Sequence, residues 1–344
     1  MELADLLNGL RRAPWLSAGR PILLNAGFTI HRGFDNTVRQ ALTERADPTR
    51  EKRLKKALTE HLVAGEKMIR LVKLEAGERV QLEDWVKGKR KTSNPLTDAF
   101  PGVASKADIV THKDLAPSSA GSIELKNGCA ALYTASRWYL DRVELPTSKL
   151  KAGAAEGFEK LIGIQRVFLQ TYEAIWVPAK GNFVCVATDL PRGVPKQFAE
   201  ASQVALQAQI RQQLGRQLSY FNFWPAIDGL YEANDGKLVD YGFTVAGKQV
   251  NHHKARRSSE CLRKAVYDKA GAAAVGDDLE LFKVAMRWEV KQDDDLNSEP
   301  EVLLPGTAAD MGKLKPTIDY AVLRDGLNSR DLDFVTSKLA LHMK

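Results

Sequence analysis

Cysteine is scarce in this chain, and long apolar runs are absent. Only three cysteines occur among 344 residues, Cys129, Cys185 and Cys261, and they lie far apart. This odd, dispersed set fits neither a disulfide framework nor a zinc cluster, and it favours a reducing cytoplasm. No apolar run approaches the length that a bilayer-spanning helix needs, so no membrane attachment is expected. The opening segment Met1–Leu7 carries acids where a secretory signal would carry basic residues.

Two common catalytic signatures are also missing. The sequence has no phosphate-cradling Gly-x-x-x-x-Gly-Lys-Ser/Thr loop, so we expect no nucleotide-driven motor within this chain. It has no Gly-x-Ser-x-Gly elbow, which excludes the usual serine hydrolase pattern. No Cys-His arrangement can be read around Cys129, for which a buried thiol is expected.

Composition and charge place the chain among ordinary globular proteins. Hydrophobic residues make up 44% and charged residues 27%, and the length suffices for two domains. The net charge is +7, from 50 Lys and Arg against 43 Asp and Glu. This mild excess is compatible with nucleic-acid binding but is not diagnostic of it.

Basic residues are clustered rather than spread evenly. They crowd the stretches 50–70, 87–91 and 254–257, while the acidic run 293–295 lies elsewhere. Clustered cations are what a surface that follows a phosphate backbone needs. Each run can equally be an ordinary solvated face, which is the alternative interpretation. We expect DNA contacts from five residues of the last two runs: Lys89, Arg90, Lys254, Arg256 and Arg257.

The most informative pattern combines Asp108 with the triplet Glu124-Leu125-Lys126. Each carboxylate lies in what reads as a short strand, and the loop 114–121 between them is rich in turn-forming residues. Because side chains alternate along a strand, Glu124 and Lys126 point to one side and Leu125 to the other. A hairpin would bring Asp108 close to both. Two carboxylates and an amine on one patch suit a hard divalent cation and a water to be activated.

This arrangement resembles the PD-(D/E)xK nuclease superfamily of restriction endonucleases and related DNA-cutting enzymes. The pattern of that superfamily is an acid at the start of a strand, a hairpin, and then acid-any-Lys on the next strand. Asp108 matches the first acid, Glu124 the second and Lys126 the lysine. Ala107 stands where the family usually has a proline. The resemblance covers roughly residues 50–190.

The resemblance implies a cytoplasmic, metal-dependent DNA endonuclease that uses Mg²⁺, with Mn²⁺ as a substitute. Asp108 and Glu124 would bind the metal, and Lys126 would orient the attacking water and offset charge on the scissile phosphate. In this family a helix ahead of the Asp strand often supplies a further acid, for which Glu60 and Glu66 are candidates. Restriction or anti-phage defence is the natural setting. The expected partners are DNA, a second copy in a homodimer, and partner proteins of a defence system.

Two alternatives stay open. Glu and Lys two residues apart on a strand commonly form a solvated face with a weak ion pair. On the same fold, the site could also be a vestige in a protein that scaffolds a DNA or protein complex without cutting. A cation between Asp108 and Glu124 would favour the enzyme, whereas a salt bridge that closes the site against Lys126 would favour the scaffold.

Periodicity, together with the resemblance, predicts an α/β fold with a restriction-endonuclease-like mixed sheet flanked by helices. We expect a helical N-terminal segment at 1–49, a nuclease core at 50–195, and an α+β accessory region at 196–344 that contacts DNA or mediates oligomerisation. Helices are predicted at 50–75, 130–143, 154–173 and 196–220. Strands are predicted at 174–177, 182–187, 238–245 and 279–290, the last two on either side of a basic helix.

Overall fold

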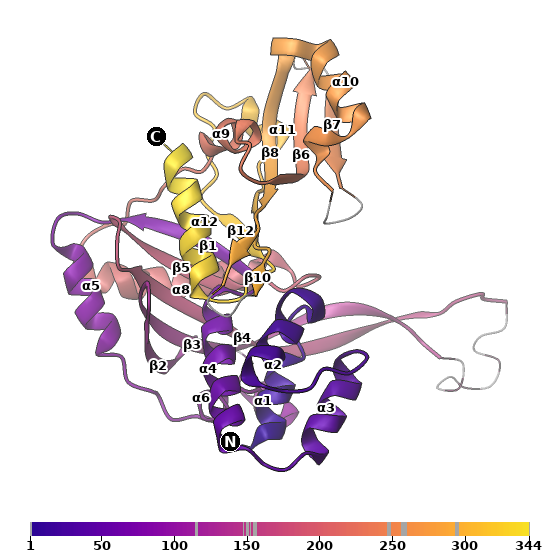
Figure 1. Ribbon diagram of the computed structural model, residues 1–344, viewed down its shortest axis with the longest axis vertical. Helices are drawn as coiled ribbons and strands as arrows, with labels where there is room; N and C mark the ends of the chain where they lie inside the picture. The colour runs from indigo at the N-terminus through magenta and orange to yellow at the C-terminus, as the bar shows by residue number, and fades with distance from the viewer. Residues whose placement is uncertain are drawn as a thin grey trace.

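The structure is a computed structural model that describes residues 2–113, 116–146, 148, 151, 153, 157–245, 249–255, 260–292 and 296–343. Within these residues the chain is a mixed α/β protein, built on a ten-stranded antiparallel sheet with a group of helices at its N-terminus (Figure 1). None of the described helices is both long and apolar enough to cross a bilayer.

The helices of the described residues include one π-helix, η1. The bounds of the α-helices and the π-helix are α1 (Leu3–Leu10), η1 (Trp15–Gly19), α2 (Arg20–Ala26), α3 (Phe34–Thr43), α4 (Pro48–Ala64), α5 (Glu78–Lys87), α6 (Pro95–Asp98), α7 (Lys106–Thr111), α8 (Lys196–Leu214), α9 (Ala226–Glu232), α10 (Val266–Val275), α11 (Ala308–Met311) and α12 (Ser329–His342). Two short 3-10 helices are η3 (Leu262–Lys264) and η4 (Gly276–Asp278).

Ten of the strands form the large sheet, and β9 and β10 pair separately. The strand bounds are β1 (Lys67–Lys73), β2 (Ser118–Leu125), β3 (Gly128–Glu144), β4 (Ile162–Pro178), β5 (Phe183–Asp189), β6 (Lys237–Val245), β7 (Gln249–Lys254), β8 (Leu279–Arg287), β9 (Val290–Lys291), β10 (Asn297–Ser298), β11 (Glu301–Leu304) and β12 (Ala321–Arg324).

The large sheet has the strand order β2-β3-β4-β5-β1-β12-β11-β8-β6-β7. The chain contains both helices and strands, as predicted for an α/β protein. Every described pairing in the large sheet is antiparallel, so the prediction of a mixed sheet is wrong. The reason is connectivity. Strands β2 to β5 follow one another directly, whereas parallel neighbours need helical crossovers.

The sheet joins the two parts of the chain that the sequence assigned to separate units. Strand β1 lies between β5 and β12, and Lys67 is opposite Leu323 on the last strand. One hydrophobic core also contains residues from both sides of the predicted 195/196 boundary, including Ile69, Trp176 and Leu332. The region 196–344 therefore completes the main sheet. Strands from both sides of the predicted boundary belong to this one sheet.

The long helix predicted at 50–75 ends earlier. It begins as α4 after Asp47, whose side chain accepts hydrogen bonds from the backbone N–H groups of Thr49 and Arg50. It ends at Ala64, and after Gly65 the chain continues as β1. Leu54, Leu58 and Leu62 are buried against α1 and α2, so the predicted apolar stripe is confirmed for α4 itself.

Two further predicted helices are strands. Residues 130–143 lie in β3 and most of 154–173 lies in β4, although residues 154–156 fall outside the described residues. Residues 129–136 are all buried, so both faces of β3 are apolar there. A strand that is buried on both faces has no period-two pattern and cannot be told from a buried helix by periodicity.

The four predicted strands and the helix predicted at 196–220 are confirmed, with adjusted ends. Strands occur at β5, β6, β8 and the end of β4, as expected. The helix predicted at 196–220 is α8, which ends earlier, at Leu214, because Gly215 adopts a left-handed conformation with φ of 68°. The basic helix predicted between β6 and β8 is wrong where the structure describes it, because Gln249–Lys254 form β7. The α-helix in this interval, α10, begins only at Val266.

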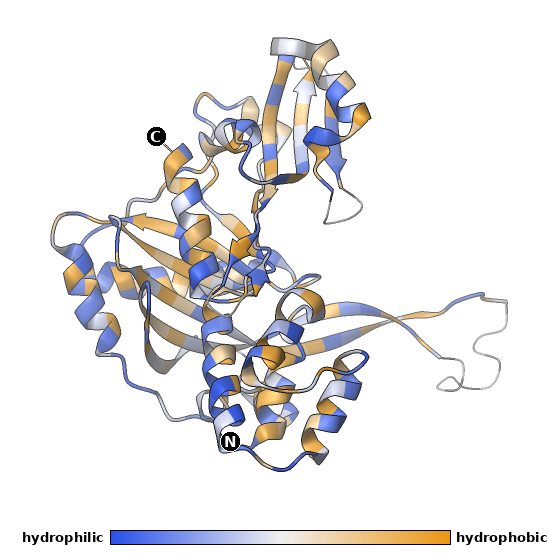
Figure 2. Ribbon diagram, in the orientation of Figure 1, coloured by the Kyte–Doolittle hydropathy of each residue, from blue (hydrophilic) through white to orange (hydrophobic). Residues whose placement is uncertain are grey.

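Strands β3 and β4 extend well beyond the sheet as a projecting arm (Figure 1). They pair continuously from Gly128 opposite Pro178 to Glu144 opposite Ile162. Hydrophobic and hydrophilic segments alternate along the arm (Figure 2). The root of the arm is held by the N-terminal helices, because Arg12 donates a hydrogen bond of 2.7 Å to the backbone oxygen of Gln170.

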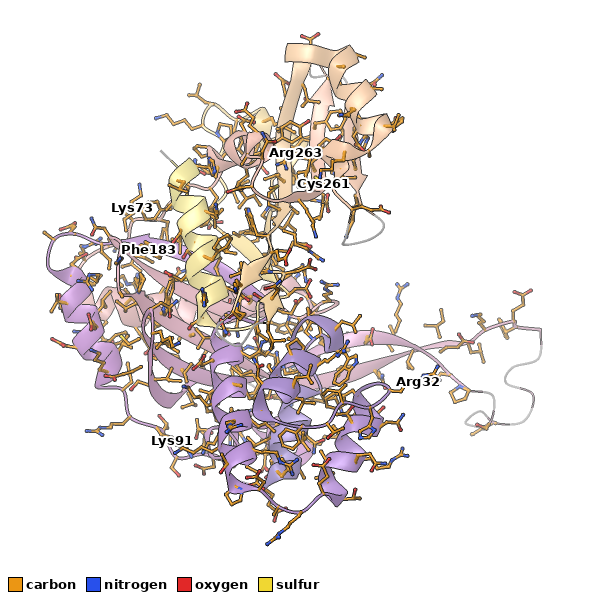
Figure 3. All side chains as sticks on the ribbon, in the orientation of Figure 1. Arg32, Lys73, Lys91, Phe183, Cys261 and Arg263 are labelled. Carbon is orange, nitrogen blue, oxygen red and sulfur yellow. The ribbon has the colours of Figure 1, made fainter. Side chains whose placement is uncertain are left out.

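The three cysteines are free, and two of them are buried. Burial raises the pKa of Cys129 to about 11, which makes this thiol a poor nucleophile. Cys261 lies in the C-terminal part of the molecule near Arg263 (Figure 3). The Arg263 guanidinium donates to the backbone oxygens of Leu230, Tyr231 and Gly236, so it holds α9 against the neighbouring strands.

Candidate functional site

Asp108 lies on a helix. It sits in the first turn of α7, where its backbone N–H donates to the Ser105 hydroxyl and that hydroxyl donates back to the Asp108 carboxylate at 2.6 Å. This reciprocal bonding caps the helix N-terminus. The prediction of a strand at Asp108 is therefore wrong, and its carboxylate has a local structural role.

Glu124 and Lys126 lie at the far end of β2 from α7. Glu124 is exposed on this edge strand opposite Cys129, and Lys126 is in the turn that leads to β3. Helix α7 contacts β3 at Ser136, whose hydroxyl donates to the Ile109 carbonyl at 2.6 Å. Seven residues of strand separate Ser136 from Cys129, or roughly 23 Å.

This separation decides what the predicted triad can do. Two ligands of one ion lie within about 5 Å of each other, because each is about 2–2.6 Å from the metal. The fold therefore does not bring Asp108 and Glu124 together on one cation. Among the described residues, no three His, Cys, Asp or Glu side chains are arranged to hold a metal ion.

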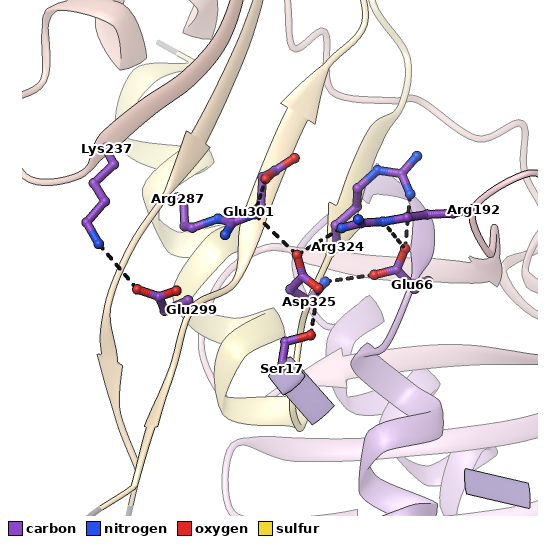
Figure 4. A network of polar contacts seen from close by, with 9 residues as sticks. All are labelled: Ser17, Glu66, Arg192, Lys237, Arg287, Glu299, Glu301, Arg324 and Asp325. Atoms are coloured by element: carbon purple, nitrogen blue, oxygen red, sulfur yellow. Dashed lines mark hydrogen bonds and ion pairs between the residues drawn. The ribbon is translucent and has the colours of Figure 1, made fainter. Parts of the chain in front are cut away.

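Glu66, the further candidate ligand, is buried between α4 and β1 within a cluster of ion pairs (Figure 4). Its carboxylate accepts from the backbone N–H of Asp325 at 2.9 Å and from Arg324 at 3.0 Å. Arg192 lies 3.5 Å from the same carboxylate. Burial raises the pKa of Glu66 above its usual value, and the neighbouring Asp325 carboxylate adds to this effect.

Asp325 is the centre of the cluster. It accepts from Ser17 at 2.7 Å, Arg192 at 3.0 Å and Arg287 at 3.3 Å (Figure 4). Its φ of 53° places it in the left-handed region, which aspartate tolerates better than most residues. Arg287 also pairs with Glu301 at 2.6 Å, so three arginines and three carboxylates balance one another. These contacts join η1, β8, β11 and β12 to Glu66, which immediately precedes β1.

A cavity of about 720 Å³ opens beside this cluster. Its walls include the apolar side chains of Trp15 and Leu16 and the charged side chains of Arg192, Arg287 and Glu289. The size falls within the range of small-molecule sites. Its charged wall contains both signs, so the wall alone selects neither an anion nor a cation.

A second charged cluster lies at the centre of the sheet. Lys67 is 0% exposed, and its ammonium lies 2.5 Å from Asp189 on the neighbouring strand. Arg12 also contacts this carboxylate, and the Tyr172 backbone N–H donates to it at 2.7 Å. Burial alone would raise the pKa of Asp189, but Arg12 and Lys67 outweigh it and hold the pKa below its usual value. The cavity that Arg12, Lys67 and Asp189 line has a volume of about 20 Å³, which is room for about one water.

The predicted DNA-contacting residues are scattered. Lys89 lies over the Trp85 ring at 4.0 Å and donates to Gln209 at 3.2 Å, so its ammonium is partly occupied. Arg90 is exposed beside it, and Lys254 is exposed at the end of β7. Arg256 and Arg257 lie outside the described residues.

Helix α4 carries a basic face, none of whose residues is among the five DNA contacts predicted from the sequence. Lys52, Arg53, Lys55 and Lys56 are all exposed on the side opposite the buried leucines. The ion pair that the described residues show for these four is that of Lys56 with Glu60, at 3.9 Å. The signal was present in the sequence, because residues three and four apart meet on one helix face. We call these four residues the α4 basic face.

The N-terminal helices are basic as a group. Residues 1–64 hold eleven Lys and Arg against seven Asp and Glu, so less than a fifth of the chain carries +4 of the +7 net charge. Arg32, exposed in the loop before α3, lies on the same unit (Figure 3).

Comparison with known proteins gives no family for this chain. No protein-family model matches the sequence, no curated protein matches it, and no solved structure matches its fold.

Proposed function

We propose that this protein binds DNA and acts as a scaffold within a DNA complex. The α4 basic face is the observation that carries this proposal. Four cations in less than two helical turns repel one another, and like charges four residues apart destabilise a helix by about 0.2–0.5 kcal/mol. The described structure supplies almost no carboxylates to offset them. A polyanion would turn this intramolecular cost into a binding contribution.

A scaffolding role is favoured over cleavage by the position of the acids. Asp108 caps α7, Glu124 lies on an edge strand, and Glu66 is held by Arg324 and Arg192. Each carboxylate has a separate environment, whereas metal-assisted phosphodiester hydrolysis needs convergent ligands. The metal-dependent nuclease that the sequence predicts is therefore the competing proposal, and a plasmid-cleavage assay tests it.

Removing the α4 basic face should weaken DNA binding and flatten its dependence on salt. The variant carries Lys52→Ala, Arg53→Ala, Lys55→Ala and Lys56→Ala. Each lost phosphate contact reduces the slope of log K against log salt by about 0.9 on duplex DNA, so the slope should fall by about three to four. Fluorescence anisotropy with a labelled duplex at several salt concentrations measures it.

The matched control removes the same charge elsewhere. Lys180, Lys264, Lys291 and Lys315 are exposed residues outside the N-terminal helices. Changing all four to alanine should lower the slope much less. Because alanine favours helix, the α4 variant should remain folded by circular dichroism. Equal losses of slope in the two variants would show that only net charge matters and would remove α4 from the interface.

The scaffold proposal also predicts that supercoiled plasmid survives incubation with the wild-type protein in Mg²⁺ or Mn²⁺. Asp108→Ala and Glu124→Ala should then change neither plasmid integrity nor DNA affinity. Agarose electrophoresis with a metal-free lane measures it. Metal-dependent nicking that both substitutions abolish would establish the nuclease instead.

A further inference from the structure

The outer part of the arm, residues 138–144 and 162–168, is a ribbon of two strands with open edges. Strand β2 covers the free edge of β3 only as far as Thr134. Strand β5 pairs with β4 only from Ala174 onwards. An isolated two-stranded hairpin is marginally stable in water. At its inner end Tyr139 lies against Phe198 of α8 and Phe168 packs on the cluster of Leu96, Ala104 and Ile109. Beyond these contacts both edges of the ribbon are free to meet a binding partner.

One face of the outer arm carries exposed aliphatic side chains. Leu140, Ile162 and Ile164 are 62%, 63% and 70% exposed. They share a face, because Leu140 is opposite Arg166 and Arg142 is opposite Ile164 in the antiparallel register. Each of the three aliphatic side chains is thus opposite a charged one, because Ile162 is opposite Glu144.

The charge on this face is positive. Arg142 and Arg166 are both exposed, and the Arg166 guanidinium lies 5.0 Å from the centre of the Trp138 ring, which orients it. The one acid on the face, Glu144, is paired with Lys160 at 3.1 Å. A second copy of the same face would bring arginine against arginine. A polyanion instead complements the two guanidiniums.

We propose that this face of the outer arm inserts into the minor groove of duplex DNA and kinks it. This inference rests on the proposed DNA binding. Arginines are drawn to the negative potential of a narrow minor groove. Aliphatic side chains such as Ile and Leu enter between base steps there, unstack them and bend the duplex. Leu140, Ile162 and Ile164 are the wedge, and Arg142 and Arg166 hold it in the groove.

Energy transfer between dyes at the two ends of a duplex of about 30 bp measures the bend, and anisotropy measures binding on the same DNA. Wild-type protein should bind and raise the transfer efficiency. The wedge variant Leu140→Thr, Ile162→Thr, Ile164→Thr keeps residues that favour strands. It should still bind, but transfer should fall to the value of the free duplex. Leu314→Thr with Val250→Thr, two exposed aliphatics elsewhere, should bend DNA like wild type.

The outcomes separate this inference from the proposal on which it rests. Binding by wild type without increased transfer overturns the wedge but leaves DNA binding intact, whereas no binding by wild type overturns the proposed function. Arg142→Gln with Arg166→Gln should lower the slope of log K against log salt by about two. An unchanged slope would remove the arm from the interface. A wild-type dimer that the wedge variant converts to monomer in light scattering would assign the face to a second copy.

Discussion

Replacing Asp189 with alanine should lower the free energy of unfolding by about 3–5 kcal/mol. Lys67 is fully buried, and Asp189 is the carboxylate that neutralises it. The substitution leaves the ammonium uncompensated in the interior and also removes the acceptor of the Tyr172 backbone N–H. Urea denaturation, followed by circular dichroism, should show a lower midpoint with an unchanged slope.

Two further variants show whether the buried charge is the cause. Asp319→Ala breaks an ion pair with Arg70 in which the carboxylate is 56% exposed, and it should cost about 0–1 kcal/mol. Lys67→Met combined with Asp189→Leu removes the buried ammonium together with the carboxylate and should recover part of the loss, because apolar replacements of a buried pair are often neutral. The recovery is incomplete, because Arg12 and the Tyr172 backbone N–H still lose their acceptor. An Asp189→Ala protein as stable as Asp319→Ala would contradict the prediction.

The contribution of Asp189 also has a defined pH dependence. Its folded-state pKa is below the usual value, so the native state favours the ionised carboxylate. The corresponding stability is present above the unfolded pKa of about 3.9 and is lost as pH falls through the lower folded value. Denaturation curves below pH 4 should therefore converge for wild type and Asp189→Ala.

Gly128→Ala should be the second large effect, with a loss of about 2–6 kcal/mol in the free energy of unfolding. Gly128 begins β3 with φ of 141°, where a side chain is strained. A Cβ atom there would also lie 2.1 Å from the backbone oxygen of Val177, so β3 and β4 would have to separate. Thermal or urea unfolding measures the loss.

Gly121→Ala is the control that isolates backbone strain from collision. Gly121 has φ of 105°, yet a Cβ atom would meet nothing within 4 Å. We expect a loss of about 1–3 kcal/mol from strain alone. Similar losses for the two variants would show that the β3–β4 contact yields easily and would contradict the larger figure for Gly128.

Local signals in the sequence predicted several elements well. The apolar stripe of α8 reflects a helix with one buried and one exposed face, which periodicity detects. Burial alternates in the first half of β8, whereas β6 is buried on both faces from Leu238 to Thr244, so its length and apolar composition mark it as a strand. The arm strands were misread because β3 is buried on both faces near its root and exposed on both faces further out. Neither part of such a strand has a regular alternation.

The candidate site was less predictable for two different reasons. The helix at Asp108 had a signal, since Ser105 followed three residues later by Asp108 is a capping-box pattern. The prediction of a strand at Asp108 followed the resemblance to the nuclease superfamily instead of this local pattern. The cluster around Asp325 had no signal, because it joins Ser17 and Glu66 to residues near the end of the chain. Ion pairs over such separations become visible only when the fold brings the strands together.

The insertion of β12 beside β1 has a consequence for synthesis on the ribosome. Strand β1 is made early, but the neighbour on one of its edges is not translated until residue 321. At about 5–20 residues per second, this interval lasts roughly 12–50 s. During that time the edge of β1 offers unpaired backbone groups and the apolar side chains Met68 and Ile69 to other nascent chains. A chain released before β12 therefore keeps an aggregation-prone edge at the centre of its sheet.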